Sequence, residues 1–82
     1  MKKIYFIYAE GCDSCAEMRR LIMDFHDKIE LVEMECETNE ALTYAVDNDI
    51  DDLPACKIGD IVIQGENFDG KSVTAAIQSY LQ

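Results

Sequence analysis

The sequence predicts an α/β fold with elements in the order βαβαββα, in which a four-stranded mixed sheet carries helices on both faces. Three observations predict it. An apolar run at residues 4–8 is typical of a strand buried on both faces, and an amphipathic helix pattern follows it. A second strand and helix pattern covers residues 30–49, and a hairpin pattern followed by a third helix ends the sequence. We expect residues 1–82 to form a single domain, because the chain is too short for a second core.

The first strand and helix are joined by a short turn. Ile4 to Tyr8 is rich in β-branched and aromatic residues, and Gly11 supplies the backbone freedom that a strand-to-helix turn needs. The pattern predicts a helix whose first helical position is Cys12. Its apolar stripe recurs at spacings of three and four and comprises Cys15, Met18, Leu21, Ile22 and Phe25.

Residues 30–37 alternate apolar side chains with glutamates, the period of a half-buried strand. Val32, Met34 and Cys36 form its apolar side. We expect this strand at an exposed edge, beside the first strand and parallel to it, because acids deter edge pairing and a helix is the usual crossover between parallel strands.

The next helix is expected to begin after Thr38, a good N-cap residue, and to bury Leu42, Ala45 and Val46. Residues 50–53 must then be extended, because proline pushes the preceding residue out of the helical region.

The last third of the sequence predicts a hairpin and a helix. Residues 55–58 and 61–64 flank Gly59-Asp60, which suits a two-residue turn with glycine first. After a loop at residues 65–70, a helix from Lys71 to the end has an apolar stripe of Val73, Ala76, Ile77, Tyr80 and Leu81.

The pair Cys12-x-x-Cys15 carries the candidate chemistry. Two cysteines three residues apart in a first helical turn lie on one face, close enough to form a disulfide. The unpaired N–H groups and the positive dipole end of the helix favour a thiolate at Cys12, which makes Cys12 the expected nucleophile. Cys15, at the start of the apolar stripe, is the expected resolving thiol.

This arrangement, a strand followed by C-x-x-C at a helix start and later by a lone proline before a hairpin, resembles the thioredoxin and glutaredoxin family. The resemblance implies a thioredoxin-like fold and thiol-disulfide oxidoreductase activity in cell redox homeostasis and electron transport. It implies a cis Leu53–Pro54 peptide beside the two thiols, and a backbone at Leu53 that pairs with an extended segment of substrate. It also implies disulfide-containing client proteins as partners, with electrons from a flavoprotein like thioredoxin reductase or, as the less favoured source, glutathione.

The sequence departs from the family pattern in the first strand. Thioredoxins carry a buried acid there, and the matching position in this sequence is Phe6. A proton acceptor for Cys15 would therefore have to be water or another residue.

Seventeen acids against seven Lys and Arg give a formal net charge of −10. This charge argues against nucleic acid and anionic membranes as partners, because both need a basic surface. The acids near the motif oppose a negative charge on Cys12, which favours a reducing role, a donor of electrons to protein disulfides. They are Glu10, Asp13 and Glu17, with Asp51 and Asp52 added if the fold is right.

No stretch of the sequence reads as a signal peptide or a membrane span. We therefore expect a cytoplasmic protein. We also expect a monomer that needs no cofactor or metal beyond its own redox-active disulfide. Two other functions stay open: a module that binds zinc or an iron-sulfur cluster through Cys12 and Cys15, and a non-catalytic adaptor with the same fold.

Several other residues have ordinary structural interpretations. Cys36 and Cys56 fall on strands that the first strand separates, which predicts two unpaired thiols, although Cys56 is near enough to Pro54 to serve as a secondary thiol. Arg19 and Arg20 are expected as surface charges, and His26 as a surface or helix-end residue. Tyr8 is either an ordinary strand aromatic or part of the site rim.

Overall fold

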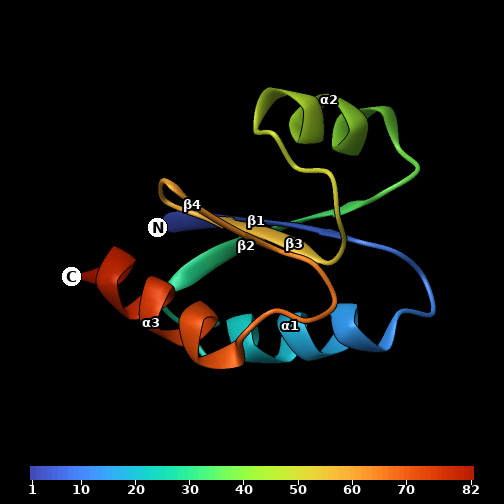
Figure 1. The fold of residues 1–82 in the computed structure, drawn as a ribbon. Helices are drawn as coiled ribbons and strands as arrows, with labels where there is room; N and C mark the ends of the chain where they lie inside the picture. Colours follow the sequence, from blue (N-terminus) through green and yellow to red (C-terminus); the bar gives the residue numbers. More distant parts are fainter.

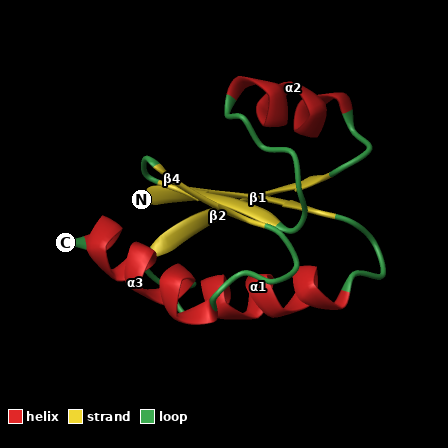
Figure 2. Cartoon of the chain, in the orientation of Figure 1, coloured by secondary structure: helices red, strands yellow, loops and turns green.

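The computed structural model describes all 82 residues and has the predicted order of elements (Figures 1 and 2). The strands are β1 (Lys2–Tyr8), β2 (Ile29–Glu35), β3 (Ala55–Ile58) and β4 (Ile61–Gln64). The helices are α1 (Asp13–Met23), α2 (Asn39–Asp47) and α3 (Gly70–Leu81). No helix is both long enough and apolar enough to cross a membrane.

The four strands form one mixed sheet in the order β2-β1-β3-β4. The edge strand β2 runs parallel to β1, as predicted, while β3 is antiparallel to both β1 and β4. Helices α1 and α3 lie together on one face of the sheet, and α2 covers the other face alone (Figure 1). The strand β1 is therefore buried on both faces, which explains its continuous apolar run.

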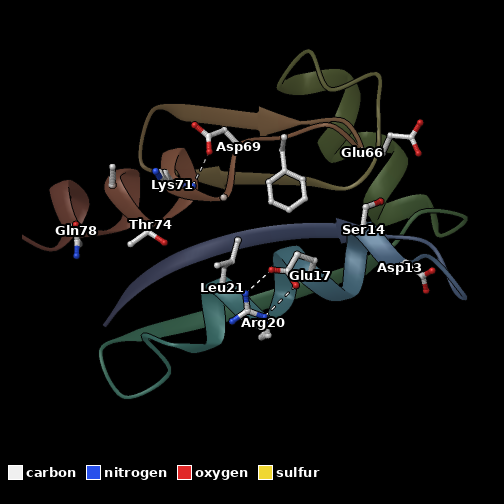
Figure 3. Close-up of a pocket in the computed structure, with 13 residues that line it drawn as sticks. Asp13, Ser14, Glu17, Arg20, Leu21, Glu66, Asp69, Lys71, Thr74 and Gln78 are labelled. Carbon is white, nitrogen blue, oxygen red and sulfur yellow. Dashed lines mark hydrogen bonds and ion pairs between the residues drawn. The ribbon is translucent and has the colours of Figure 1, made fainter.

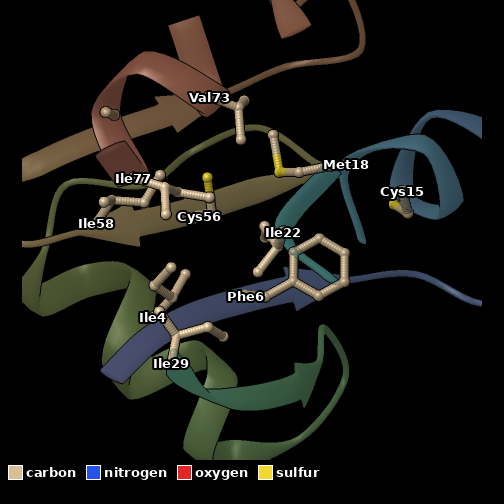
Figure 4. Packing of buried hydrophobic residues seen from close by; sticks show 11 residues of the cluster. Ile4, Phe6, Cys15, Met18, Ile22, Ile29, Cys56, Ile58, Val73 and Ile77 are labelled. Atoms are coloured by element: carbon tan, nitrogen blue, oxygen red, sulfur yellow. The ribbon is translucent and has the colours of Figure 1, made fainter. Parts of the chain in front are cut away.

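The main core lies between the sheet and the helix pair α1/α3 (Figure 4). Ile4 and Phe6 on β1 are completely buried there, against Met18 and Ile22 of α1 and Ile77 of α3. The remaining core side chains are Cys15, Ile29, Cys56, Ile58, Val73 and Ala76. The stripes predicted for α1 and α3 are thus confirmed, with Phe25 just beyond the end of α1 and packed against the same core.

The face that α2 buries differs from the predicted one. Leu42 is 55% exposed and Val46 is 78% exposed, whereas Ala41 is buried in a small second cluster with Ile7, Met34 and Ala55. The Tyr44 ring stacks on the Tyr5 ring of β1 at 4.8 Å between centroids.

The physical reason is that Ala41, Tyr44 and Ala45 also recur at three and four. Small alanines let the helix approach the sheet closely, and the tyrosine pairs with an aromatic partner that lies far away in sequence. Hydrophobicity alone favoured the larger residues, Leu42 and Val46.

The predicted Thr38 cap and the predicted hairpin turn are present. The Thr38 hydroxyl accepts a hydrogen bond from the Ala41 N–H at 3.1 Å. Asp69, which the sequence predicts only as part of a loop, caps α3 because its carboxylate accepts a hydrogen bond from the Lys71 N–H at 3.0 Å. Gly59 turns the β3–β4 hairpin with a φ of 61°, a left-handed conformation that favours glycine.

Candidate dithiol site

The first cysteine of the motif lies one position before the helix. The prediction that Cys12 is the first helical residue is wrong: Cys12 is the N-cap, with φ −99° and ψ 114°, and α1 begins at Asp13. Its Sγ accepts a hydrogen bond from the Cys15 N–H at 3.1 Å. The sulfur thus takes the place that a Ser or Asp oxygen usually fills, among the free N–H groups of the first turn. At this N-cap position, the free N–H groups and the positive dipole end of α1 still favour a thiolate at Cys12.

Cys12 and Cys15 form a disulfide, with their Cα atoms 5.2 Å apart. The two sulfurs differ in access, because Cys15 is only 1% exposed and belongs to the main core, whereas Cys12 is half-buried. The Ser14 Oγ lies 3.3 Å from the Cys12 Sγ, within hydrogen-bond distance for sulfur. The structure therefore offers one accessible sulfur, held by polar groups, and one sheltered sulfur.

The loop before β3 lies at the same end of the sheet as this disulfide. Ile7 near the end of β1 pairs with Ala55, so Pro54 lies beside the point where the chain leaves β1 for Cys12. The Leu53–Pro54 peptide is cis, in agreement with the expectation from the resemblance. Pro54 is buried and Leu53 is half-buried.

Two side chains that the sequence analysis did not single out as positioning groups hold this loop. The Gln64 Oε1 accepts hydrogen bonds from the backbone N–H groups of Asp51 and Asp52, at 2.9 and 3.0 Å. The Asp52 Oδ1 accepts one from the Leu53 N–H at 2.9 Å. The Leu53 N–H, which the resemblance assigns to substrate, is therefore bonded to a neighbouring carboxylate.

Arg19, which the sequence predicts only as a surface charge, also has a defined place beside the site. Its guanidinium carbon lies 4.8 Å from the centre of the Tyr8 ring and 5.3 Å from that of Phe6, and its Nε donates to the Glu33 carboxylate at 2.6 Å. Together with Cys12 and Cys15, Arg19 lines a cavity of about 250 Å³. Tyr8 lines the same cavity, so it belongs to the rim of the site, the second of its two interpretations.

The acids expected near the motif are only partly gathered around it. Glu10 and Asp13 line the cavity with Cys12, whereas Glu17 faces a different groove and pairs with Arg20. A hydrogen bond from the Arg20 guanidinium holds the pKa of Glu17 below its usual value. Asp51 and Asp52 lie in the loop before Pro54.

The larger groove, of about 810 Å³, runs between α1 and α3 (Figure 3). One end of the groove lies beside the motif, at Asp13 and Ser14. Leu21 and Phe68 are among its apolar lining residues. The Glu17–Arg20 pair lies along one wall in Figure 3.

Cys36 and Cys56 are unpaired, as expected. Burial raises the pKa of Cys56 to about 12, which favours the protonated thiol at neutral pH. Burial and the adjacent Glu35 raise the pKa of Cys36. His26 is exposed beyond the end of α1, and no group of three or more His, Cys, Asp or Glu side chains is arranged to hold a metal ion.

Comparison with known proteins gives structural neighbours only. No protein-family model matches the sequence, and no curated protein matches it. Among solved structures, thioredoxin O2 from Arabidopsis thaliana in its oxidised state matches with a TM-score of 0.71 and 9% identity, over 98% of this chain and 75% of that chain. Thioredoxin 1 from Thermosipho africanus matches with a TM-score of 0.58 and 22% identity, over 96% of this chain and 93% of that chain.

A malarial protein gives a TM-score of 0.58 at 17% identity, over 98% of this chain and 97% of that chain. The neighbours and the strand order together establish the architecture. The chain has a thioredoxin-like fold that carries a disulfide-bonded C-x-x-C pair at the start of its first helix.

Proposed function

We propose that the protein is a thiol-disulfide oxidoreductase that reduces the disulfides of client proteins through Cys12 and Cys15. The observation that carries the proposal is the asymmetry of the pair: Cys12 is accessible at the N-cap of α1, and the Cys15 it bonds to is 1% exposed. A nucleophile must reach its client, and a resolving thiol must be protected from competing with it.

The reaction begins with the reduced pair. The Cys12 thiolate attacks one sulfur of the client disulfide, which forms a mixed disulfide and releases the other client sulfur as a thiolate that takes a proton from water. The Cys15 thiol then loses its proton, and its sulfur attacks the Cys12 Sγ. The second client thiolate leaves and is protonated, and Cys12–Cys15 is again a disulfide. Two electrons have passed from the protein to the client.

Client binding is proposed at the cis Pro54 loop. An extended client segment would pair with the Leu53 backbone and so present its disulfide to Cys12. The Leu53 N–H would then exchange its bond to the Asp52 carboxylate for a client carbonyl.

The pair would then be reduced again by an external electron donor. We propose a flavoprotein like thioredoxin reductase for this step in preference to glutathione, an anion that the charge of −10 repels. The protein would act in the cytoplasm as a monomer, without a bound cofactor.

Insulin reduction with dithiothreitol as the electron donor tests the proposal. Wild-type protein should accelerate precipitation of the reduced insulin chains, and Cys12→Ser should abolish the acceleration. Cys15→Ser should accumulate a covalent mixed disulfide, visible by non-reducing electrophoresis. Cys36→Ser is the matched control, because Cys36 is unpaired and should be dispensable. Full activity in Cys12→Ser would refute the proposal.

A further inference from the structure

The resolving thiol lacks the buried acid that could accept its proton. Phe6 fills the corresponding place on β1 and is completely buried, and no buried side chain in the structure is polar or charged. The buried members of the main core, to which Cys15 belongs, are apolar apart from the thiol of Cys56 (Figure 4). An apolar setting by itself opposes ionisation of Cys15, which the second half of the reaction requires.

One cation is placed to offset this. Arg19 lies four residues after Cys15, so the two side chains share one face of α1. Both line the 250 Å³ cavity beside the disulfide. The charged and titratable groups facing that cavity are Tyr8, Glu10, Asp13 and Arg19, together with the two cysteines. Arg19 is the one cation among them.

Three contacts hold the Arg19 side chain in place. Its guanidinium rests against the Tyr8 and Phe6 rings, whose centroids are 5.8 Å apart in a stacked arrangement, and its Nε is bonded to Glu33 on β2. A guanidinium over aromatic rings stays charged and is attracted by the ring faces. The Arg19–Glu33 pair is partly exposed to solvent, at 37% and 41%, so Glu33 reduces the field of Arg19 without cancelling it.

We propose that Arg19 is a positioning residue that promotes ionisation of Cys15 in the mixed disulfide and so speeds release of the client. The proposal rests on the proposed function. Where a buried carboxylate would accept the proton, this chain has a cation supported by aromatic rings, and water carries the proton away. In the reduced pair Cys12 ionises first and its charge keeps Cys15 protonated, so Arg19 acts mainly once Cys12 is bonded to the client.

The test is the pH dependence of the two steps, followed with dithiobis(nitrobenzoate) as a chromogenic substitute for the client disulfide. All variants are made in a Cys36→Ser background, and the remaining free thiol, Cys56, is only 1% exposed, so the reagent reacts with the active pair. Attack by Cys12 releases the first thionitrobenzoate, and attack by Cys15 on the resulting mixed disulfide releases the second. The midpoint of the pH profile of the second release reports the ionisation of the Cys15 thiol in the mixed disulfide.

Arg19→Gln should raise that midpoint by at least about half a pH unit and slow the second release about threefold or more near neutral pH. Glu33→Gln, which removes the counter-charge, should move the midpoint the other way. Arg19→Lys, which keeps the positive charge, should shift the midpoint less than Arg19→Gln does. Arg20→Gln is the matched control: it removes the same charge one residue along the helix, outside the cavity, and should leave the midpoint in place.

An unchanged midpoint in both Arg19→Gln and Glu33→Gln, or an equal shift in Arg20→Gln, would overturn the proposal. Thermal unfolding of each variant separates a folding defect from an electrostatic one, and Glu33→Gln keeps the test decisive if Arg19→Gln is unstable. A wild-type protein that never releases the second thionitrobenzoate would refute the proposed function itself. Normal two-step release with no Arg19 effect would refute this inference alone.

Discussion

At the scale of single residues, Cys12 has two structural roles in one atom. Its sulfur caps α1 by accepting the Cys15 N–H, and the same sulfur forms the disulfide. A reduced Cys12 thiolate would keep that N–H, and a Ser14 hydroxyl 3.3 Å away, as donors. Glu10 and Asp13 act in the opposite direction. In the proposed reaction, the balance of these neighbours would set the reactivity of Cys12.

If a client pairs with the Leu53 backbone as proposed, the Asp52 carboxylate competes with the client for the Leu53 N–H. Asp52→Ala should lower KM for a disulfide-containing client about fivefold, because a net hydrogen bond contributes about 1 kcal/mol. Asp51→Ala removes the same charge from the neighbouring residue without freeing that N–H, and it serves as the control in steady-state insulin reduction. If the two variants behave alike, general charge explains the effect, and Leu53 does not pair with the client.

The residues that sequence could predict at the site are those whose signal is local. Cys12 and Cys15 are three residues apart, and the lone Pro54 precedes a hairpin. The role of Gln64 depends on hydrogen bonds to residues 12 and 13 positions away, and that of Arg19 on rings of β1 and a carboxylate of β2. Nothing in the neighbouring sequence marks such contacts, because they exist only once the sheet has formed.

At the scale of elements, α2 shows that a contact with another element can decide which helix face is buried, against the order of side-chain hydrophobicity. Periodicity correctly predicted the existence of α2, and Thr38 its start, while the buried face depended on Tyr5 across the interface. The stripes of α1 and α3 were predictable because large apolar residues such as Met18, Ile22 and Ile77 also lie on the buried face. On α2 the largest apolar residues, Leu42 and Val46, do not lie on the buried face. The buried face is the one on which the small Ala41 lets the helix approach the sheet closely.

Two truncations on α2 test this face. Tyr44→Ala should lower the free energy of unfolding by about 2 kcal/mol, because it removes the stacked ring and leaves a partly filled space against β1. Val46→Ala should change it by less than about 0.5 kcal/mol, because Val46 is 78% exposed. Urea denaturation measures both. Comparable losses, or a larger loss for Val46, would contradict the observed orientation of α2.

At the scale of the whole molecule, the topology brings the motif and the proline loop to one end of the sheet. β1 leads into Cys12, and β3 pairs with β1 so that Pro54 lies beside it. The net charge of −10 disfavours thiolates, and we propose that it favours clients with a basic docking surface. A less stabilised thiolate makes the reduced pair a better electron donor, which is the basis for proposing a reducing role.

The most direct test is the reduction potential of the Cys12–Cys15 pair, measured against glutathione and dithiothreitol redox buffers with Cys12→Ser as control and Cys36→Ser as matched variant. We predict one two-electron transition near the roughly −270 mV of thioredoxin, kept in Cys36→Ser and lost in Cys12→Ser. A potential near the roughly −120 mV of a strong disulfide oxidant would contradict the reducing role. A transition that survives in Cys12→Ser would contradict the assignment of the dithiol itself.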